Sequence, residues 1–223
     1  MTIHPSHDAA PGPAVQADRW VVLANPRVAP LPPREQGWFV RLVLRASRLK
    51  TDGPGGRGEV LNVFSTLARA PSLLLRWLVF ASGLMPYGKL PRPDTERIIL
   101  RVGWRTGSWY EWVQHVRLGR MAGLSLEEID ALRQGEAKQW TPRTRALMQA
   151  VDALVTRQQL DDGQWQALRQ HLSQAQCIEF CLLTGHYVML AMTLNTLGVA
   201  VEPQFAADLA STPGAAGVRA GRN

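Results

Sequence analysis

A dense succession of helix start and stop signals over residues 93–198 constrains the fold more than any other feature of this chain. Pro93 and the acidic residues after it favour the first turn of a helix, because carboxylates interact well with the positive end of the helix dipole. Gly107 is typical of a helix end, since glycine adopts the left-handed backbone that closes many helices. Ser125 and Glu128 have the spacing of a capping box. Further helix boundaries are indicated by Thr141 with Pro142, Asp161, Gln174 and Gly198.

The rest of the chain divides into an arm, further helices and a tail. Residues 1–33 are rich in Pro, Ala and His and predict an extended N-terminal arm. Residues 34–203 predict one helical domain, because apolar residues recur at helical spacing and no segment shows sustained strand alternation. Residues 204–223 have little apolar surface to bury and predict a disordered tail. The fold class expected is therefore all-α.

Charge and cysteine content narrow the partners and the compartment. The net charge is +7, but no run of five or more basic residues occurs, so nucleic-acid binding is not expected. Two cysteines are too few for a disulfide framework, and the N-terminus lacks the pattern of a secretory signal. Apolar stretches interrupted at Pro71, Arg76 and Pro86 fall short of the roughly 20 residues that span a bilayer. We expect a cytoplasmic protein that does not bind membranes and needs no cofactor.

Four polar residues stand in an apolar, helix-forming context between Glu96 and His115. On a helix that begins near Ser108, the side chains of Ser108, Glu111 and His115 share one face at offsets of three and seven residues. Burying two carboxylates without partners would cost several kcal/mol, an expense that is easier to explain if they form a site. The alternative is a core histidine hydrogen-bonded to the backbone. We take Glu111 and His115 as a candidate proton-transfer pair.

Nearby aromatic and basic residues are candidates for substrate binding. Trp109 and Trp112 are close enough to this stripe to wall a pocket for a planar substrate, although tryptophans also fill cores. Arg101 repeats with two other arginines every four residues, a pattern typical of a solvated face or of a contact to a substrate carboxylate. His186, on the last helix, is expected to line the same cavity or to pack near an oligomer interface.

The two cysteines, Cys177 and Cys181, lie four residues apart on one face of a predicted helix. Free cysteines of this kind usually act as small hydrophobic residues of the core. Their spacing is not the Cys-x2-Cys arrangement at a helix start that lowers a thiol pKa. As metal ligands with His186 they would need a fourth partner, so no metal site is expected.

The order Glu96, Ser108, Glu111, His115 resembles the pattern E-x11-C-x2-C-x3-H of the γ-carboxymuconolactone decarboxylase and alkyl hydroperoxidase D family. The continuation HVRLGRMAGLSLEEIDAL and the last helix, GHYVMLAMTLNTLGVAVEP, also resemble that family. The likeness covers residues 30–203. It implies the all-helical fold of the family, assembled as a homo-oligomer of dimers, trimers or hexamers.

The chain departs from the peroxidase branch of the family at two positions. Ser108 and Glu111 stand where that branch has a nucleophilic and a resolving cysteine. Peroxide reduction needs a low-pKa thiolate and a partner thiol, which serine and glutamate do not supply. The resemblance therefore implies decarboxylase-like chemistry. In it His115 is the general acid, Glu111 and Glu96 orient it and raise its basicity, and Ser108 donates a hydrogen bond to substrate or water.

We accordingly expect acid/base chemistry on a small anionic organic acid or lactone, most simply a decarboxylation. The same groups would serve an isomerisation or a hydrolysis, and the sequence does not choose among these. Two other functions stay open: a peroxidase-related antioxidant protein that uses Cys177 or Cys181, and a non-catalytic helical oligomer. Oligomerisation is expected because a helix with apolar residues on several faces, such as 72–84, needs a partner.

Overall fold

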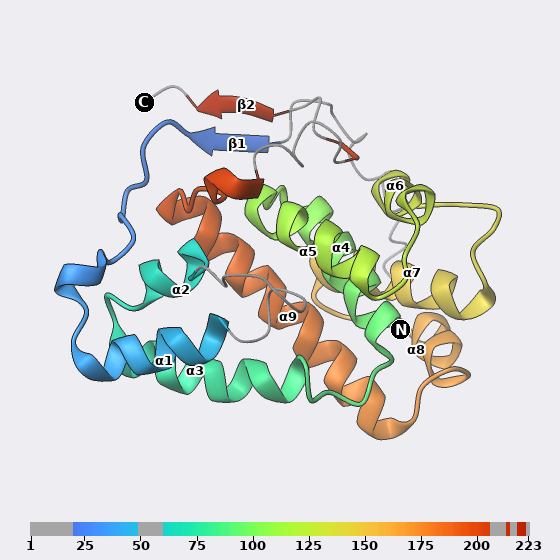
Figure 1. The fold of residues 1–223 in the computed structure, drawn as a ribbon. Coiled ribbons are helices and arrows are strands. Elements are labelled where there is room, and N and C mark those ends of the chain that lie inside the picture. Colours follow the sequence, from blue (N-terminus) through green and yellow to red (C-terminus); the bar gives the residue numbers. More distant parts are fainter. Residues whose placement is uncertain (1–19, 49–59, 206–212, 215–217, 222–223) are drawn as a thin grey trace, which may run out of the picture.

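The computed structural model describes residues 20–48, 60–205, 213–214 and 218–221, and within them the chain is mostly helical (Figure 1). The described α-helices are α1 (Trp38–Arg48), α2 (Asn62–Leu67), α3 (Pro71–Leu84), α4 (Arg92–Thr106), α5 (Trp109–Met121), α6 (Leu126–Gln134), α7 (Pro142–Arg157), α8 (Asp162–Arg169) and α9 (Gln174–Leu197). Short 3-10 helices occur at Pro33–Glu35 and Pro203–Phe205. Strands β1 (Trp20–Leu23) and β2 (Val218–Gly221) lie at the two ends of the described chain.

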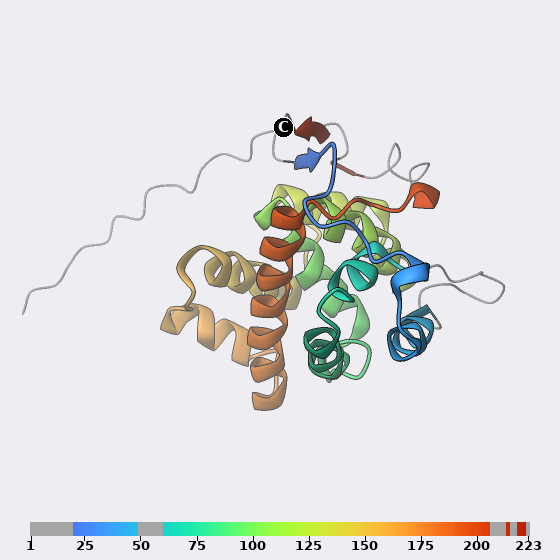
Figure 2. The same cartoon turned by 90° about the vertical axis from the view of Figure 1, so that its left-hand side faces the viewer.

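Helix α9 runs through the middle of the molecule. Figure 2 shows it between two groups of helices, with α1 to α3 on one side and α7 and α8 on the other. Helix α4 packs against α5, α7 and α9, and its residues from Asp94 to Trp104 are almost all buried. The candidate residues Glu96 and His115 are therefore carried by two adjacent helices, α4 and α5, at the centre of the fold.

The helix boundaries follow the capping signals of the sequence. Ser125 and Asp161 form capping boxes at the starts of α6 and α8, and Gly107 closes α4 with a left-handed backbone at φ 67°. Ser108 occupies the N-cap position of α5, but its side chain accepts no capping hydrogen bond. The predicted start of a helix near Ser108 is therefore confirmed.

A short parallel strand pair joins the two ends of the described chain, in register from Trp20 with Val218 to Leu23 with Gly221. The indole of Trp20 donates a hydrogen bond to the Gly214 carbonyl at 3.0 Å. The expectation of an entirely disordered tail is thus wrong for the described C-terminal residues. Backbone hydrogen bonding, which needs no apolar side chains, orders this segment.

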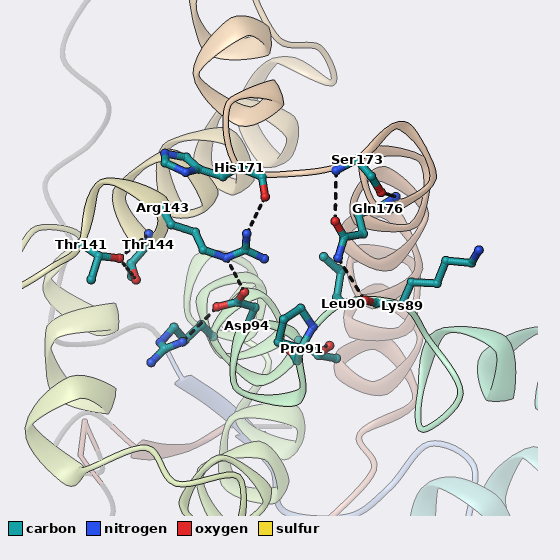
Figure 3. Close-up of polar contacts among 12 residues, drawn as sticks. Lys89, Leu90, Pro91, Asp94, Thr141, Arg143, Thr144, His171, Ser173 and Gln176 are labelled. Atoms are coloured by element: carbon teal, nitrogen blue, oxygen red, sulfur yellow. Dashed lines mark hydrogen bonds and ion pairs between the residues drawn. The ribbon is translucent and has the colours of Figure 1, made fainter.

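The N-terminal end of α4 is fixed to its neighbours by polar contacts (Figure 3). Arg143 of α7 donates to the Asp94 carboxylate at 2.8 Å and to the His171 carbonyl at 2.5 Å. Gln176, in the first turn of α9, donates to the Lys89 carbonyl at 3.1 Å. These contacts hold the first turn of α4, which carries Asp94, against α7 and the loop between α8 and α9.

Helix α9 corrects one expectation about apolar stretches. By length and composition alone it could cross a membrane, and 56% of its most apolar window is buried inside the protein. Pro71, Arg76 and Pro86 interrupt only the apolar stretch of α3 and its flanks. The prediction overlooked the apolar segment that forms α9. The packing of α9 against α3, α4, α5, α7 and α8 is that of a core helix.

Candidate functional site

A cavity of about 470 Å³ lies between α2, α3, α5 and α9. Its wall is largely apolar, with Leu61, Val63, Phe64, Trp77, Leu84 and Leu190 among the lining residues. The polar residues that reach it are Ser82, Arg92, Tyr110, Glu111, Gln114, His115, His186 and Tyr187. A concave, mostly apolar cavity with a few convergent polar groups is typical of a small-molecule site.

His115 and Glu96 form the central polar pair of this site. The His115 Nδ1 atom lies 2.7 Å from Glu96 Oε2, and both side chains are buried. The other Glu96 oxygen lies 2.6 Å from a guanidinium nitrogen of Arg92, whose side chain is 38% exposed. Glu96 itself does not line the cavity; it sits behind His115 and fixes the ring. Because Nδ1 is occupied by the carboxylate, Nε2 is the nitrogen left for the cavity.

Glu111 differs from Glu96 in its surroundings. It lines the cavity, is 2% exposed, and neither of its carboxyl oxygens has a hydrogen-bond partner among the described residues. Burial raises the pKa of Glu111 well above its usual range. The neighbouring Ser108 hydroxyl lowers the pKa of Glu111, although the two groups lack ordinary hydrogen-bond geometry. Burial therefore favours the neutral form of Glu111, and Glu96 is the residue that orients His115.

His186 and Tyr187 of α9 form an aromatic wall beside His115. The Tyr187 ring lies edge-on to both His115 and His186, with centroids 5.1 Å apart in each case. His186 also stacks on Trp77 at 5.9 Å. Burial, with the nearby charge of His115, lowers the pKa of His186 to about 4, so its ring is neutral at neutral pH. The structure places His186 on the wall of the cavity that His115 also lines.

A further buried carboxylate, Glu202, binds two residues that line the cavity, Tyr110 and Gln114. It accepts hydrogen bonds from the Tyr110 hydroxyl and from the Gln114 amide, both at 2.6 Å. It also accepts one from the backbone N–H of Asn62, at the start of α2, at 2.5 Å. Glu202 therefore ties α2 to α5. Sequence reasoning missed it because it follows α9 at a distance of 92 residues from Tyr110.

Three predicted substrate-binding residues lie away from the cavity. Trp109 and Trp112 pack with Trp20 and Trp104 in an aromatic cluster, where ring centroids are 5.2 to 6.1 Å apart. Trp112 also donates to the Pro213 carbonyl at 2.7 Å. The helix face that bears these rings points to β1 and the C-terminal residues, so their predicted role as pocket walls is wrong.

Arg101 is likewise a structural residue. Its guanidinium donates to both carboxylate oxygens of Asp152, at 2.8 and 2.7 Å, and to the Leu132 carbonyl at 2.6 Å. These contacts use the planar fork of the group to join α4 with α6 and α7. The cation at the cavity is Arg92 instead. Its position four residues before Glu96 was the available signal, since such pairs meet on one helix face.

Neither the two cysteines nor any metal-binding group of the described residues contributes to the site. Cys177 is buried and Cys181 is exposed on α9, and neither lines the cavity. Burial and the neighbouring Cys177 raise the pKa of the Cys181 thiol, which is the opposite of an activated thiolate. Within the described ranges, no group of three or more histidine, cysteine or acidic residues has the arrangement of a metal site.

The helical arrangement is an AhpD-like fold, as comparison with solved structures shows. A cysteine-to-alanine variant of the debrominase Bmp8, solved in complex with 2,3,4-tribromopyrrole, superposes with a TM-score of 0.70 at 16% identity. That alignment covers 85% of this chain and 98% of the debrominase. An AhpD-core, peroxidase-related protein from Ralstonia eutropha JMP134 gives a TM-score of 0.69 at 21% identity, covering 82% and 96% of the two chains. At these identities the likeness establishes the fold alone.

Residues 71–153 match the model of the carboxymuconolactone decarboxylase family, and this segment contains α3 to α6 and most of α7, with Glu96, Glu111 and His115. This match and the AhpD-like fold agree with the resemblance noted in the sequence. No protein with a curated description matches the sequence significantly.

Proposed function

We propose that this protein is a carboxymuconolactone decarboxylase-like enzyme that acts by acid/base chemistry on a small anionic organic acid or lactone. The single observation that carries the proposal is the buried His115–Glu96 pair, joined at 2.7 Å and facing a largely apolar cavity. A histidine oriented by a carboxylate is a common general acid or base. The reaction it serves most simply here is a decarboxylation.

The steps follow from the groups at the cavity. As the bond to the leaving carboxylate breaks, CO2 departs and its electron pair is delocalised into the conjugated part of the substrate. His115 then delivers the proton on Nε2 to carbon, while Glu96 stabilises the imidazolium through Nδ1. Arg92, half-exposed and with only one nitrogen engaged by Glu96, provides a cation for a substrate carboxylate that is retained.

The redox alternative has less support. Ser108 and Glu111 hold the positions where a thiol peroxidase of this family carries its cysteines, and the two cysteines of this chain lie outside the cavity. The raised pKa of Cys181 also disfavours a reactive thiolate. A peroxidase assay with Cys181→Ser distinguishes the two functions, because only the redox function needs that thiol.

The test is CO2 release from a panel of carboxylated γ-lactones, measured for wild type and His115→Gln. We expect His115→Gln to lower the turnover rate about 100-fold or more, the usual contribution of a general acid. His171→Gln is the matched control, because it is the same histidine-to-glutamine substitution at a residue that does not line the cavity. Equal turnover of wild type and His115→Gln, or peroxide consumption that only Cys181→Ser removes, contradicts the proposal.

A further inference from the structure

Glu111 is a buried polar group that the steps above do not use. Its side chain lines the cavity, yet neither oxygen has a hydrogen-bond partner among the described residues. Leaving such a group unsatisfied costs roughly 1–3 kcal/mol or more, and unsatisfied groups of this kind are rare in folded proteins. A hydrogen-bond partner on a bound ligand removes this cost, which explains why the site retains an unpaired carboxyl group.

The nearby cations do not serve Glu111. Arg92 and His115 are both engaged with Glu96, at 2.6 and 2.7 Å, and the remaining neighbour, Ser108, is uncharged. Burial without a cation raises the pKa of Glu111 and so favours its protonated form. In this form the carboxyl group presents one O–H donor to the cavity. An uncharged oxygen is the acceptor that suits it, because a second carboxylate would bring an unneutralised charge into an apolar wall.

We propose that Glu111 binds the carbonyl oxygen of the substrate by donating a hydrogen bond from its carboxylic acid group, so that this residue selects acids that carry a carbonyl group. This inference rests on the proposed function and gives Glu111 a role in it. When the bond to the carboxylate breaks, CO2 leaves and the electron pair moves through the conjugated system onto the carbonyl oxygen. The hydrogen bond from Glu111 strengthens as that charge develops, and the proton stays on Glu111. His115 then protonates the carbon.

The test compares two small acids that differ only in the carbonyl group. The probes are 5-oxotetrahydrofuran-2-carboxylate and tetrahydrofuran-2-carboxylate, titrated into the full-length protein by calorimetry. We expect wild type to bind the lactone acid about tenfold more tightly, the value of one satisfied hydrogen bond in a buried site. Glu111→Gln keeps most of that preference, because its amide still donates. Glu111→Leu loses the preference and retains the affinity for the ether acid.

Infrared spectroscopy gives a second readout that does not depend on the leucine variant folding. Wild type at pH 7 should show the carbonyl band of a protonated carboxylic acid, absent in Glu111→Gln. This band should move to lower frequency with the lactone acid and not with the ether acid.

Equal affinity of wild type for the two probes, an unchanged preference in Glu111→Leu, no detectable binding of the lactone acid at millimolar concentration, or absence of the band overturns the inference. The proposed function fails separately. In that case no acid releases CO2, or His115→Gln is fully active, while the preference for the carbonyl probe persists.

Discussion

Two glutamates of the same site show how surroundings decide the role of a residue. Glu96 and Glu111 are both almost fully buried, at 0% and 2% exposure. Glu96 contacts a guanidinium and an imidazole. Neither carboxyl oxygen of Glu111 has a hydrogen-bond partner among the described residues, and burial raises the pKa of Glu111. One residue therefore orients His115, and the other is left to bind a ligand.

The residues at the centre of the site could be found from the sequence, whereas their partners could not. The spacing of Glu96, Glu111 and His115 placed them on two adjacent helices, which the structure confirms. Assigning Glu111 as a second orienter of His115 was wrong, because four-residue spacing brings two side chains near each other without fixing a hydrogen bond. The direction of the Trp109 and Trp112 rings depends on which neighbours cover α5, and periodicity carries no such information.

His186 makes the stability of the protein depend on pH. Its pKa is about 4 in the folded protein, against roughly 6.5 in an unfolded chain. Between these values the unfolded state binds the extra proton, so lowering the pH from 7 to 4 reduces the free energy of unfolding. We expect His186→Gln to lose less stability over this interval than wild type, by about 1–3 kcal/mol.

Urea unfolding at several pH values measures the effect of His186. The difference between wild type and His186→Gln isolates this residue, since both proteins retain Glu111 and His115. His171→Gln should follow the wild-type curve. Parallel curves for wild type and His186→Gln would show that folding does not lower the pKa of His186.

At the scale of the helices, polar contacts between distant residues fix how α4 packs against α7 and how α2 packs against α5. Arg101 joins it to α7 through Asp152, and Glu202 joins α2 to α5. Helix ends were predictable because capping is local, as the boxes at Ser125 and Asp161 show. These ties were not predictable, because their partners are up to 140 residues apart in the sequence.

Removal of the Arg101 tie should destabilise the fold. We expect Arg101→Met to lower the free energy of unfolding by about 2–4 kcal/mol, because it leaves Asp152 and the Leu132 carbonyl without a buried donor. Chemical denaturation measures the loss. Arg157→Ala removes an exposed pair with Asp161 and should cost less than about 1 kcal/mol. Similar losses for the two variants would mean that the buried tie contributes little.

At the scale of the molecule, the regular structure of the described residues is helical apart from the β1–β2 pair. The helical class was predictable from periodicity and caps over most of the chain. The strand pair was not, since it joins four residues near each end of the described chain and the pairing is set by spatial proximity. Large apolar side chains remain exposed on α3 and α9, including Leu73, Val79, Ile178 and Met192 at 60–73% exposure. Exposed apolar residues in such numbers indicate an interface.

We propose that these faces bury against further copies of the chain. Light scattering coupled to gel filtration should give a mass that is a multiple of 24.7 kDa. Val79→Glu and Ile178→Glu together should shift it towards the monomer, because a charge is costly to bury in an apolar interface. Leu126→Glu, at a position 40% exposed on α6, is the control and should leave the mass unchanged. A monomeric wild type contradicts the proposal.

The distribution of indoles gives the protein an optical reporter of ligand binding. Of its eight tryptophans, all within the described ranges, Trp77 alone lines the cavity, stacked on His186. Trp20, Trp104, Trp109 and Trp112 emit from a cluster away from the cavity. A ligand that enters the cavity without rearranging the fold should therefore change the fluorescence of one indole against a steady background. Trp77→Phe should abolish that change, so occupancy of the site can be followed by fluorescence before any substrate is known.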